Sequence, residues 1–351
     1  MIKRSCLFLG MLFLVQHVFS QDSLKTKKVK ILPVPAFGYS PETRSYLGAV
    51  ALFTFNLYKD SLTRISNAKL EFNYTQNKQL ILETAWNYFF RQEKWFTKGQ
   101  FHYSQFPDLY YGIGSQTPKT NKLVFSSSRI IAEAFALKRI KLKVFSGVNV
   151  KYINYSNLKA DSLRVNYPEL IDASTFGIGY SLLKDTRDNL LTPNMGVYIY
   201  GNTTYNFSEN NYLEFTIDLR YYKTWKNKYT WSNRLINDIN LGTPPFYDYA
   251  FLGGDKFVRG YYYGRYRNNN LSSWQSEFRF PIVWRIGLST FGGLSTIFSK
   301  TDGPEFSKIK TNYGLGLRFL VDKKDRTNLR LDYALGNNDN SGFYVSFGES
   351  F

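Results

Sequence analysis

Two residues in the stretch GQFHYSQF have the types and the spacing that nucleophilic chemistry requires. His102 and Ser104 are two positions apart, so on an extended strand they share a face, and the imidazole could act as a base for the hydroxyl. The sequence shows no third group that would orient the imidazole, and Gln100 makes the same face polar. A structural histidine is therefore the favoured interpretation, and a hydrolase is the alternative.

The N-terminal residues restrict the remaining chemistry. Lys3 and Arg4 precede an apolar run that is too short to span a bilayer, which is the layout of a secretory signal peptide over residues 1–20. Its removal would take away Cys6, the one cysteine, and leave His102 as the one histidine. We therefore expect an exported chain with no disulfide, no transition-metal site, no cofactor and no dedicated catalytic residue.

The stretch FLGGDKFVRGYYYGRYR, Phe251 to Arg267, is unusual for a loop. It surrounds a Gly-Gly turn with aromatic and basic side chains, where turn residues usually stand. Its position must be set by the segments on either side of it.

Those segments alternate strictly between apolar and polar residues. In NYLEFTIDLRYY, one face carries Leu213, Phe215, Ile217, Leu219 and Tyr221, and the other carries Glu214, Thr216, Asp218 and Arg220. This period of two predicts strands with one apolar and one charged face. A soluble sandwich would show the same alternation, but these segments run for about 9–13 residues, whereas soluble strands average about 5–6. Aromatic residues also recur near the segment ends, as interfacial girdles require.

About sixteen such segments occupy the chain, an even count that is typical of bacterial barrels. They lie near 31–38, 45–57, 66–77, 79–91, 96–107, 124–137, 140–155, 173–184, 197–207, 211–223, 228–241, 273–284, 286–298, 311–321, 327–336 and 342–351. We predict an all-β protein in which residues 31–351 form one transmembrane antiparallel β-barrel. Both termini, and the short turns, are expected on the periplasmic side. The last segment places Phe343, Val345, Phe347 and Phe351 on one face.

Three motifs in this order resemble those of the BamA/TamA-type barrels, the bacterial surface antigen superfamily. KDTRDNLLTPNMG is similar to the family's turn motif through Asp185, Arg187, Asp188, Pro193 and Gly196. The pattern F-x-G-G…V-R-G-Y is matched by Phe251, Gly253, Gly254, Val258, Arg259, Gly260 and Tyr261, and E-x-R-x-P by Glu277, Arg279 and Pro281. The terminal aromatic segment, with Phe347 and Phe351, resembles the signal that the outer-membrane assembly machinery reads.

The resemblance implies that the loop, residues 243–272, folds back from outside and rests its tip on the inner wall of the barrel. A buried Arg259 then needs an acidic partner for its fixed donors, and alternation turns Glu277 inward, so Glu277 is the expected partner. The family often has a further acid on the next strand, but Gly293 stands there, with Ser295 in place of a glycine. Either Glu277 alone holds the arginine, or the loop is held differently. An ordinary external loop is the alternative.

The family usually carries periplasmic βααβ modules before the barrel. Here only QDSLKTKKVK, a short polar tail over residues 21–30, precedes the first segment. The resemblance therefore implies a barrel-only branch of the family.

The net charge of +18 suggests anionic partners. Basic residues are scattered along the whole chain, and an exported protein rarely meets nucleic acid, so we expect no nucleic-acid partner. Outer-membrane lipid and lipopolysaccharide are the expected surroundings, and periplasmic assembly factors or client proteins are the candidate partners.

The resemblance implies a protein of the bacterial outer membrane that assists the insertion or translocation of protein, or of lipid. A weak seam between the first and last strands would let a client strand pair with an exposed edge, and Pro33 and Pro35 each remove a donor there. A passive, loop-plugged pore is the alternative. The charged inner wall would suit it, through Glu214, Asp218, Arg220, Arg234, Asp238, Arg318, Arg330 and Asp332. A barrel phospholipase built on His102 and Ser104 is the third candidate.

Overall fold

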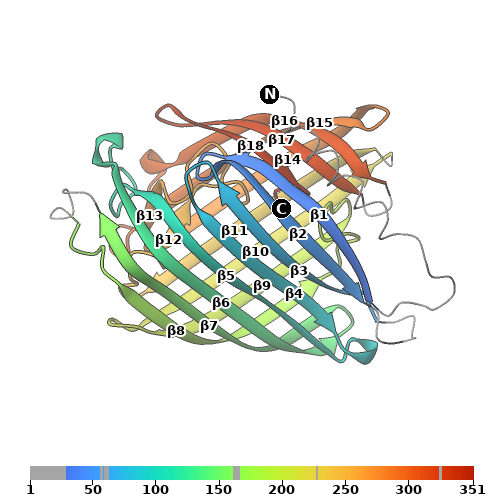
Figure 1. Cartoon of the computed structure of the whole chain (residues 1–351), viewed down its shortest axis with the longest axis horizontal. Helices are drawn as coiled ribbons and strands as arrows, with labels where there is room; N and C mark the ends of the chain where they lie inside the picture. Colours follow the sequence, from blue (N-terminus) through green and yellow to red (C-terminus); the bar gives the residue numbers. More distant parts are fainter. Residues whose placement is uncertain (1–28, 56–57, 59–62, 161–166, 227, 324–325) are drawn as a thin grey trace, which may run out of the picture.

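The computed structural model describes residues 29–55, 58, 63–160, 167–226, 228–323 and 326–351, so the predicted signal peptide lies outside the described residues. Sixteen antiparallel strands close into one barrel, as predicted, and β18 returns to β1 (Figure 1). The strands are β1 (Val29–Ser40), β2 (Arg44–Phe55), β3 (Ser66–Thr75), β4 (Leu80–Phe89), β5 (Trp95–Tyr110), β6 (Leu123–Lys141), β7 (Val144–Ala160), β8 (Ala173–Asp185), β9 (Gly196–Phe207), β10 (Tyr212–Trp225), β11 (Tyr229–Leu241), β14 (Asn270–Val283), β15 (Ile286–Phe298), β16 (Lys310–Asp322), β17 (Thr327–Gly336) and β18 (Asn340–Phe347).

The connections hold a few short elements. Two strands, β12 (Ala250–Leu252) and β13 (Tyr266–Asn268), pair as a separate hairpin between β11 and β14. Short 3-10 helices are η2 (Arg91–Glu93), η3 (Lys119–Asn121) and η5 (Phe306–Lys308). The described part of the chain has no helix with the length and apolar character of a transmembrane helix.

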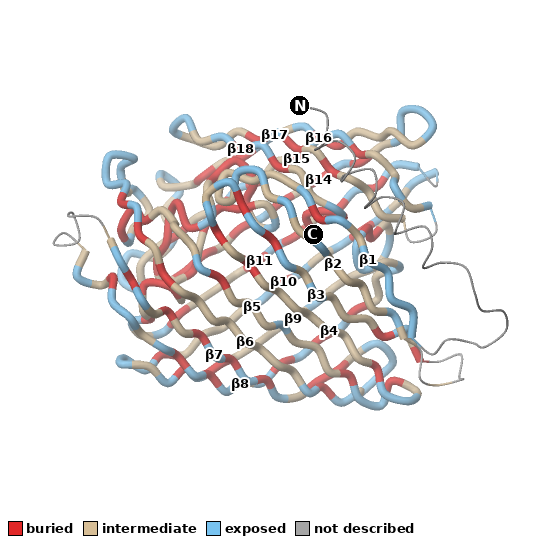
Figure 2. The backbone as a smooth tube through the Cα atoms, viewed as in Figure 1, coloured by how far each residue is buried: buried red, intermediate tan, exposed pale blue. Residues whose placement is uncertain are grey.

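The wall has an apolar outer face and a charged inner face. On β10, Ile217 and Tyr221 are exposed outward, whereas Asp218 between them is buried. Figure 2 shows buried and exposed residues alternating along the strands. Several of the predicted inner-wall charges are buried, namely Asp218, Arg234, Arg318, Arg330 and Asp332. The period of two in the sequence therefore gave the correct facing of these residues.

The two ends of the barrel differ in the length of their connections. β1 begins and β18 ends at the same end, where tight turns such as 142–143 and 284–285 join the strands. The other end carries the long connections 111–122, 242–269 and 299–309. Since outer-membrane barrels have short periplasmic turns and longer external loops, we assign the end with the tight turns to the periplasm.

The last strand ends earlier than predicted. The predicted segment 342–351 corresponds to β18 (Asn340–Phe347), and residues 348–351 leave the wall. Gly348 has a φ of +79°, a left-handed conformation that glycine adopts without strain. Phe351 is buried, whereas Phe343 and Phe347 are exposed. The prediction that Phe351 shares their strand face is wrong, because Gly348 turns the chain into the lumen.

The seam between β1 and β18 is the least paired junction of the barrel. Its register holds one pair of Cα partners, Tyr39 with Val345, whereas every residue of β1 has a partner on β2. Two aromatic pairs also bridge it: the ring centroids of Phe37 and Phe347 lie 5.7 Å apart, as do those of Tyr39 and Phe343. Backbone hydrogen bonding therefore contributes little to closing the barrel here.

Candidate functional site: the lumen loop and its charged anchor

The connection between β11 and β14 folds into the barrel and builds a small core of its own. Its residues Leu252, Val258, Tyr261 and Tyr266 are almost completely buried. They pack with wall residues such as Ile297. The aromatic composition of the loop is therefore that of an interior, since a loop in a lumen must bury its own side chains.

Two glycines of the motif allow the loop to approach the backbone closely. Gly253 has a φ of +120°, and a Cβ there would lie 2.0 Å from the carbonyl oxygen of Tyr262. Gly260 has a φ of +100°, and a Cβ there would lie 2.8 Å from the carbonyl oxygen of Leu335 on β17. Any other residue would be strained at both positions: at Gly253 it would clash within the loop, and at Gly260 it would push the loop away from β17.

Arg259 is the anchor of the loop, and the structure places it beside Glu277, the partner that the sequence suggested. Its guanidinium donates to Glu277 on β14 at 2.6 Å and to Asp332 on β17, and it stacks on the ring of Phe291 with 3.4 Å to the centroid. Arg259 is 2% exposed. Asp332 was predicted to face the lumen but not to bind the loop, so the second acid comes from β17 rather than from position 293.

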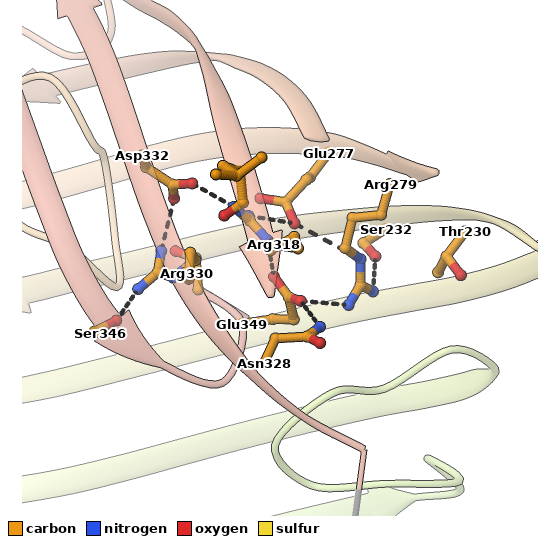
Figure 3. Close-up of polar contacts among 12 residues, drawn as sticks. Thr230, Ser232, Glu277, Arg279, Arg318, Asn328, Arg330, Asp332, Ser346 and Glu349 are labelled. Carbon is orange, nitrogen blue, oxygen red and sulfur yellow. Dashed lines mark hydrogen bonds and ion pairs between the residues drawn. The ribbon is translucent and has the colours of Figure 1, made fainter. Parts of the chain in front are cut away.

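The anchor belongs to a larger cluster of charges, and Figure 3 shows the members on β14, β16 and β17 together with Glu349. Arg318 donates to Asp332 at 2.5 Å and to Glu349 at 2.8 Å, and it lies 3.4 Å from Glu277. Four arginines thus meet four carboxylates in what we call the lumen charge cluster: Arg259, Arg279, Arg318 and Arg330 with Asp255, Glu277, Asp332 and Glu349. Pairing of this kind is needed for buried charges, because each one alone would be costly to desolvate.

Tyrosines beside the anchor fix the rest of the motif. The hydroxyl of Tyr261 donates to the carbonyl of Thr311 at 2.7 Å and accepts from the amide of Asn337 at 2.7 Å. The amide of Gly260 donates to the hydroxyl of Tyr344 on β18 at 3.0 Å. The Arg-Gly-Tyr segment is therefore bound to the last strands of the barrel.

The C-terminal residues reach the same cluster. Glu349 accepts from Arg318, and its amide donates to the carbonyl of Leu191 at 2.9 Å. The hydroxyl of Ser350 donates to the carbonyl of Asp255, at the loop tip, at 2.8 Å. Burial by itself would raise the pKa of Glu349, but the guanidinium groups of Arg318 and Arg279 outweigh it and lower that pKa to about 2.

The predicted turn motif lies beneath the loop at the periplasmic end. Asp185 accepts from Arg187 at 2.9 Å, and Asp188 accepts from the amides of Asn194 and Met195. Gly196 has a φ of +113°, and the carbonyl of Pro193 accepts from Arg279 at 2.6 Å. The structure therefore brings together the turn motif, the loop motif and the C-terminus, which lie far apart in the sequence.

His102 and Ser104 face the lumen on β5, away from the charge cluster. The imidazole Nε2 lies 3.0 Å from the Ser104 hydroxyl, and Nδ1 lies 3.1 Å from Glu83, which pairs in register with His102 from β4. A third group does therefore orient the imidazole, contrary to the prediction, and only strand pairing could have revealed it. The Ser104 side chain is 0% exposed, so the hydroxyl is closed to a substrate.

We expect a fluorophosphonate probe to leave the folded protein unlabelled, because the Ser104 hydroxyl is buried. The measurement is labelling of the purified protein followed by mass spectrometry, with the Ser104→Ala variant as the control. Labelling that disappears in this variant would instead make the three residues a hydrolytic site.

Among the residues that the structure describes, no group of three or more histidine, cysteine or acidic side chains is arranged to hold a metal ion.

The barrel, its apolar outer face and its loop anchored in a charged lumen together define a bacterial outer-membrane β-barrel. The model of the Omp85 superfamily domain matches residues 43–351, so the chain belongs to the Omp85 superfamily.

Several solved structures share the fold of this chain. BamA from Haemophilus ducreyi lacking POTRA domains 1–3 has a TM-score of 0.62 at 12% identity, over 98% of this chain and 78% of that chain. CdiB from Acinetobacter baumannii has a TM-score of 0.57 at 12% identity, over 92% of this chain and 60% of that chain. CdiB from Escherichia coli has a TM-score of 0.57 at 9% identity, and this chain spans 63% of its length. No protein of curated function matches the sequence. The chain thus shares the barrel fold of these structures and is an outer-membrane barrel of the Omp85 superfamily.

Proposed function

We propose that the protein assists the insertion or translocation of protein at the outer membrane by opening the seam between β1 and β18. The observation that carries this proposal is the single pair of Cα partners at the seam, beside continuous pairing at the neighbouring β1–β2 junction. Opening the seam would expose two strand edges, and an unfolded client strand can add to such an edge through backbone hydrogen bonds.

The first strand is suited to this role. Pro33 and Pro35 lie within β1 and pair in register with Ala51 and Ala49 of β2. Proline has no backbone donor, so these two positions cannot donate hydrogen bonds to any partner strand. β18 also ends at Phe347, which lies opposite Phe37 in this register. Residues 29–36 of β1 therefore extend beyond β18, and only the part of β1 near Tyr39 is paired with it.

The lumen loop supports assembly rather than passive conduction. Its buried core and its anchor on β14 and β17 occupy the barrel interior, so a wide, steadily open pore is not favoured. Single-channel recording separates the two functions, because a porin shows steady conductance and a loop-plugged barrel shows small, erratic currents.

A disulfide across the seam is expected to stop client insertion. Tyr39→Cys with Val345→Cys places two thiols on register partners, and the one native cysteine, Cys6, lies in the predicted signal peptide. The measurement is insertion of an unfolded eight-stranded barrel protein into proteoliposomes containing the variant. Oxidation should lower the rate to that of protein-free liposomes, and reductant should restore it.

The control is a disulfide at a fully paired junction, Leu315→Cys with Tyr333→Cys between β16 and β17. This variant should insert the client at the same rate when oxidised and when reduced. Unchanged insertion by the oxidised seam variant would contradict lateral opening.

Co-purification from native outer membranes would show whether periplasmic assembly factors accompany the protein.

A further inference from the structure

Exposed lysines gather at the periplasmic end of the barrel. The tight turns and adjoining strand ends there carry Lys94, Lys141, Lys143, Lys226, Lys228 and Lys323, all exposed. Of the carboxylates at this end, Glu93 is paired with Arg64, and Asp188 is paired with Arg326. The outer loops instead place Glu169, Asp172, Glu209, Asp302, Glu305 and Asp339 among their lysines. Positive charge is therefore concentrated on the periplasmic side.

Three further lysines near this end, within the strands, point outward from the barrel rather than down into the periplasm. Lys138 is exposed on β6, next to Leu137, which faces the lumen and is 0% exposed. Lys184 is exposed between the buried residues Leu183 and Asp185. Lys223 is exposed beside the buried Tyr222. By the alternation of a strand, all three lysines lie on the face that contacts lipid.

Tryptophans lie beside two of these lysines, Lys138 and Lys223, on the same face. Trp95 is exposed and is the register partner of Lys138, whose ammonium lies 6.0 Å from the centroid of the indole ring. Lys223 lies 5.6 Å from the ring centroid of Trp225 and pairs in register with Trp231. The rings of Trp225 and Trp231 stack with centroids 6.1 Å apart. Indole rings prefer the level of lipid headgroups, so these pairs mark the inner-leaflet interface.

We propose that this periplasmic belt, formed by Trp95, Lys138, Lys184, Lys223, Trp225 and Trp231, binds the headgroups of anionic phospholipids in the inner leaflet. Each ammonium would face a lipid phosphate while the neighbouring ring lies against the glycerol and upper acyl region. The outward direction of the three lysines favours lipid over an acidic protein, because a protein docking from the periplasm would contact the turns below them. This surface lies apart from the seam and the lumen loop, and it goes beyond the proposed function.

The test uses tryptophan fluorescence of the full-length protein folded into phosphatidylcholine vesicles. Brominated phosphatidylglycerol or brominated phosphatidylcholine is added, and quenching gives the relative association of each lipid. A Trp274→Phe background removes the tryptophan near the external end of β14. The wild-type protein should associate with phosphatidylglycerol about fivefold more strongly than with phosphatidylcholine. This ratio should fall at about 0.5 M salt.

The triple variant Lys138→Gln, Lys184→Gln and Lys223→Gln should lose this preference, and the corresponding triple arginine variant should keep it. The matched control replaces three exposed lysines of the external end with glutamine, Lys119, Lys122 and Lys159, and should leave the preference unchanged. Heat-modifiable gel mobility confirms that each variant is folded.

A preference that survives in the glutamine triple variant, or that the external control loses equally, would overturn the proposal. So would a wild-type protein that is quenched equally by both lipids, and the belt would then be better explained as a surface for an acidic periplasmic protein.

Discussion

Replacing Arg259 with alanine is expected to release the lumen loop from the inner wall. The guanidinium is 2% exposed and is bound to Glu277 and Asp332, so its removal leaves two buried carboxylates short of a counter-charge. Breaking a buried ion pair from one side costs about 3–5 kcal/mol, compared with about 0–1 kcal/mol for a surface pair. Limited proteolysis should cleave the loop sooner, and single-channel recording should show a larger current.

Two further variants test this explanation. Arg259→Lys should restore the loop only in part, because an ammonium cannot contact both carboxylates with the planar geometry of a guanidinium. Arg326→Ala removes an arginine from a more exposed pair with Asp188, whose side chains are 35% and 25% exposed, and should change little. An Arg259→Ala protein with wild-type protease resistance and current would show that the anchor does not hold the loop.

Loss of the C-terminal phenyl ring is expected to reduce the amount of protein assembled in the outer membrane. Deletion of Phe351, or Phe351→Asp, would disturb a residue that is 7% exposed at the end of a tail held by Glu349 and Ser350. A carboxylate at this buried position would be costly to desolvate. We expect a severalfold lower surface level, measured by heat-modifiable gel mobility of isolated outer membranes.

The matched control places the same charge on an exposed ring of an external loop. Phe306 is 93% exposed, so Phe306→Asp should assemble normally. Phe347→Asp tests the other candidate for the assembly signal, because Phe347 lies on the outer face of β18 and packs on Phe37 across the seam. Normal surface levels for the Phe351 variants would contradict a role of the terminal residue in assembly.

Much of the barrel could be predicted from the sequence because its signal is local. The alternation of apolar and polar residues correctly predicted that Glu277 and Asp332 face the lumen. The order of motifs, through its resemblance to the family, predicted that Arg259 lies there as well. The pairing of Arg259 with Asp332 could not be predicted in the same way. Asp332 lies 73 residues further along the chain, and only closure of the barrel brings the two together. At Gly293, where the family often has an acid, a Cβ would lie 2.1 Å from the side-chain amide of Gln275, which lies in that space.

The same limit explains two other differences. Glu83 is 19 residues from His102 in the chain, and strand register, rather than composition, makes them neighbours. The inward turn at Gly348 depends on arginines that β14 and β16 present to Glu349. The alternation of apolar and polar residues predicted that the last strand continues through Phe351, because this pattern contains no information about charges on the opposite wall.

The distribution of the lumen charge cluster along the chain sets an order for biogenesis. Arg259 and Asp255 belong to the loop, whereas Asp332 and Glu349 belong to the final part of the chain. Until that part has joined the wall, the arginines on β16 and in the loop have too few counter-charges to be desolvated. The loop can therefore dock stably only after the last strand is in place. We therefore expect docking of the loop to follow completion of the wall, because the loop gains its last counter-charges only then.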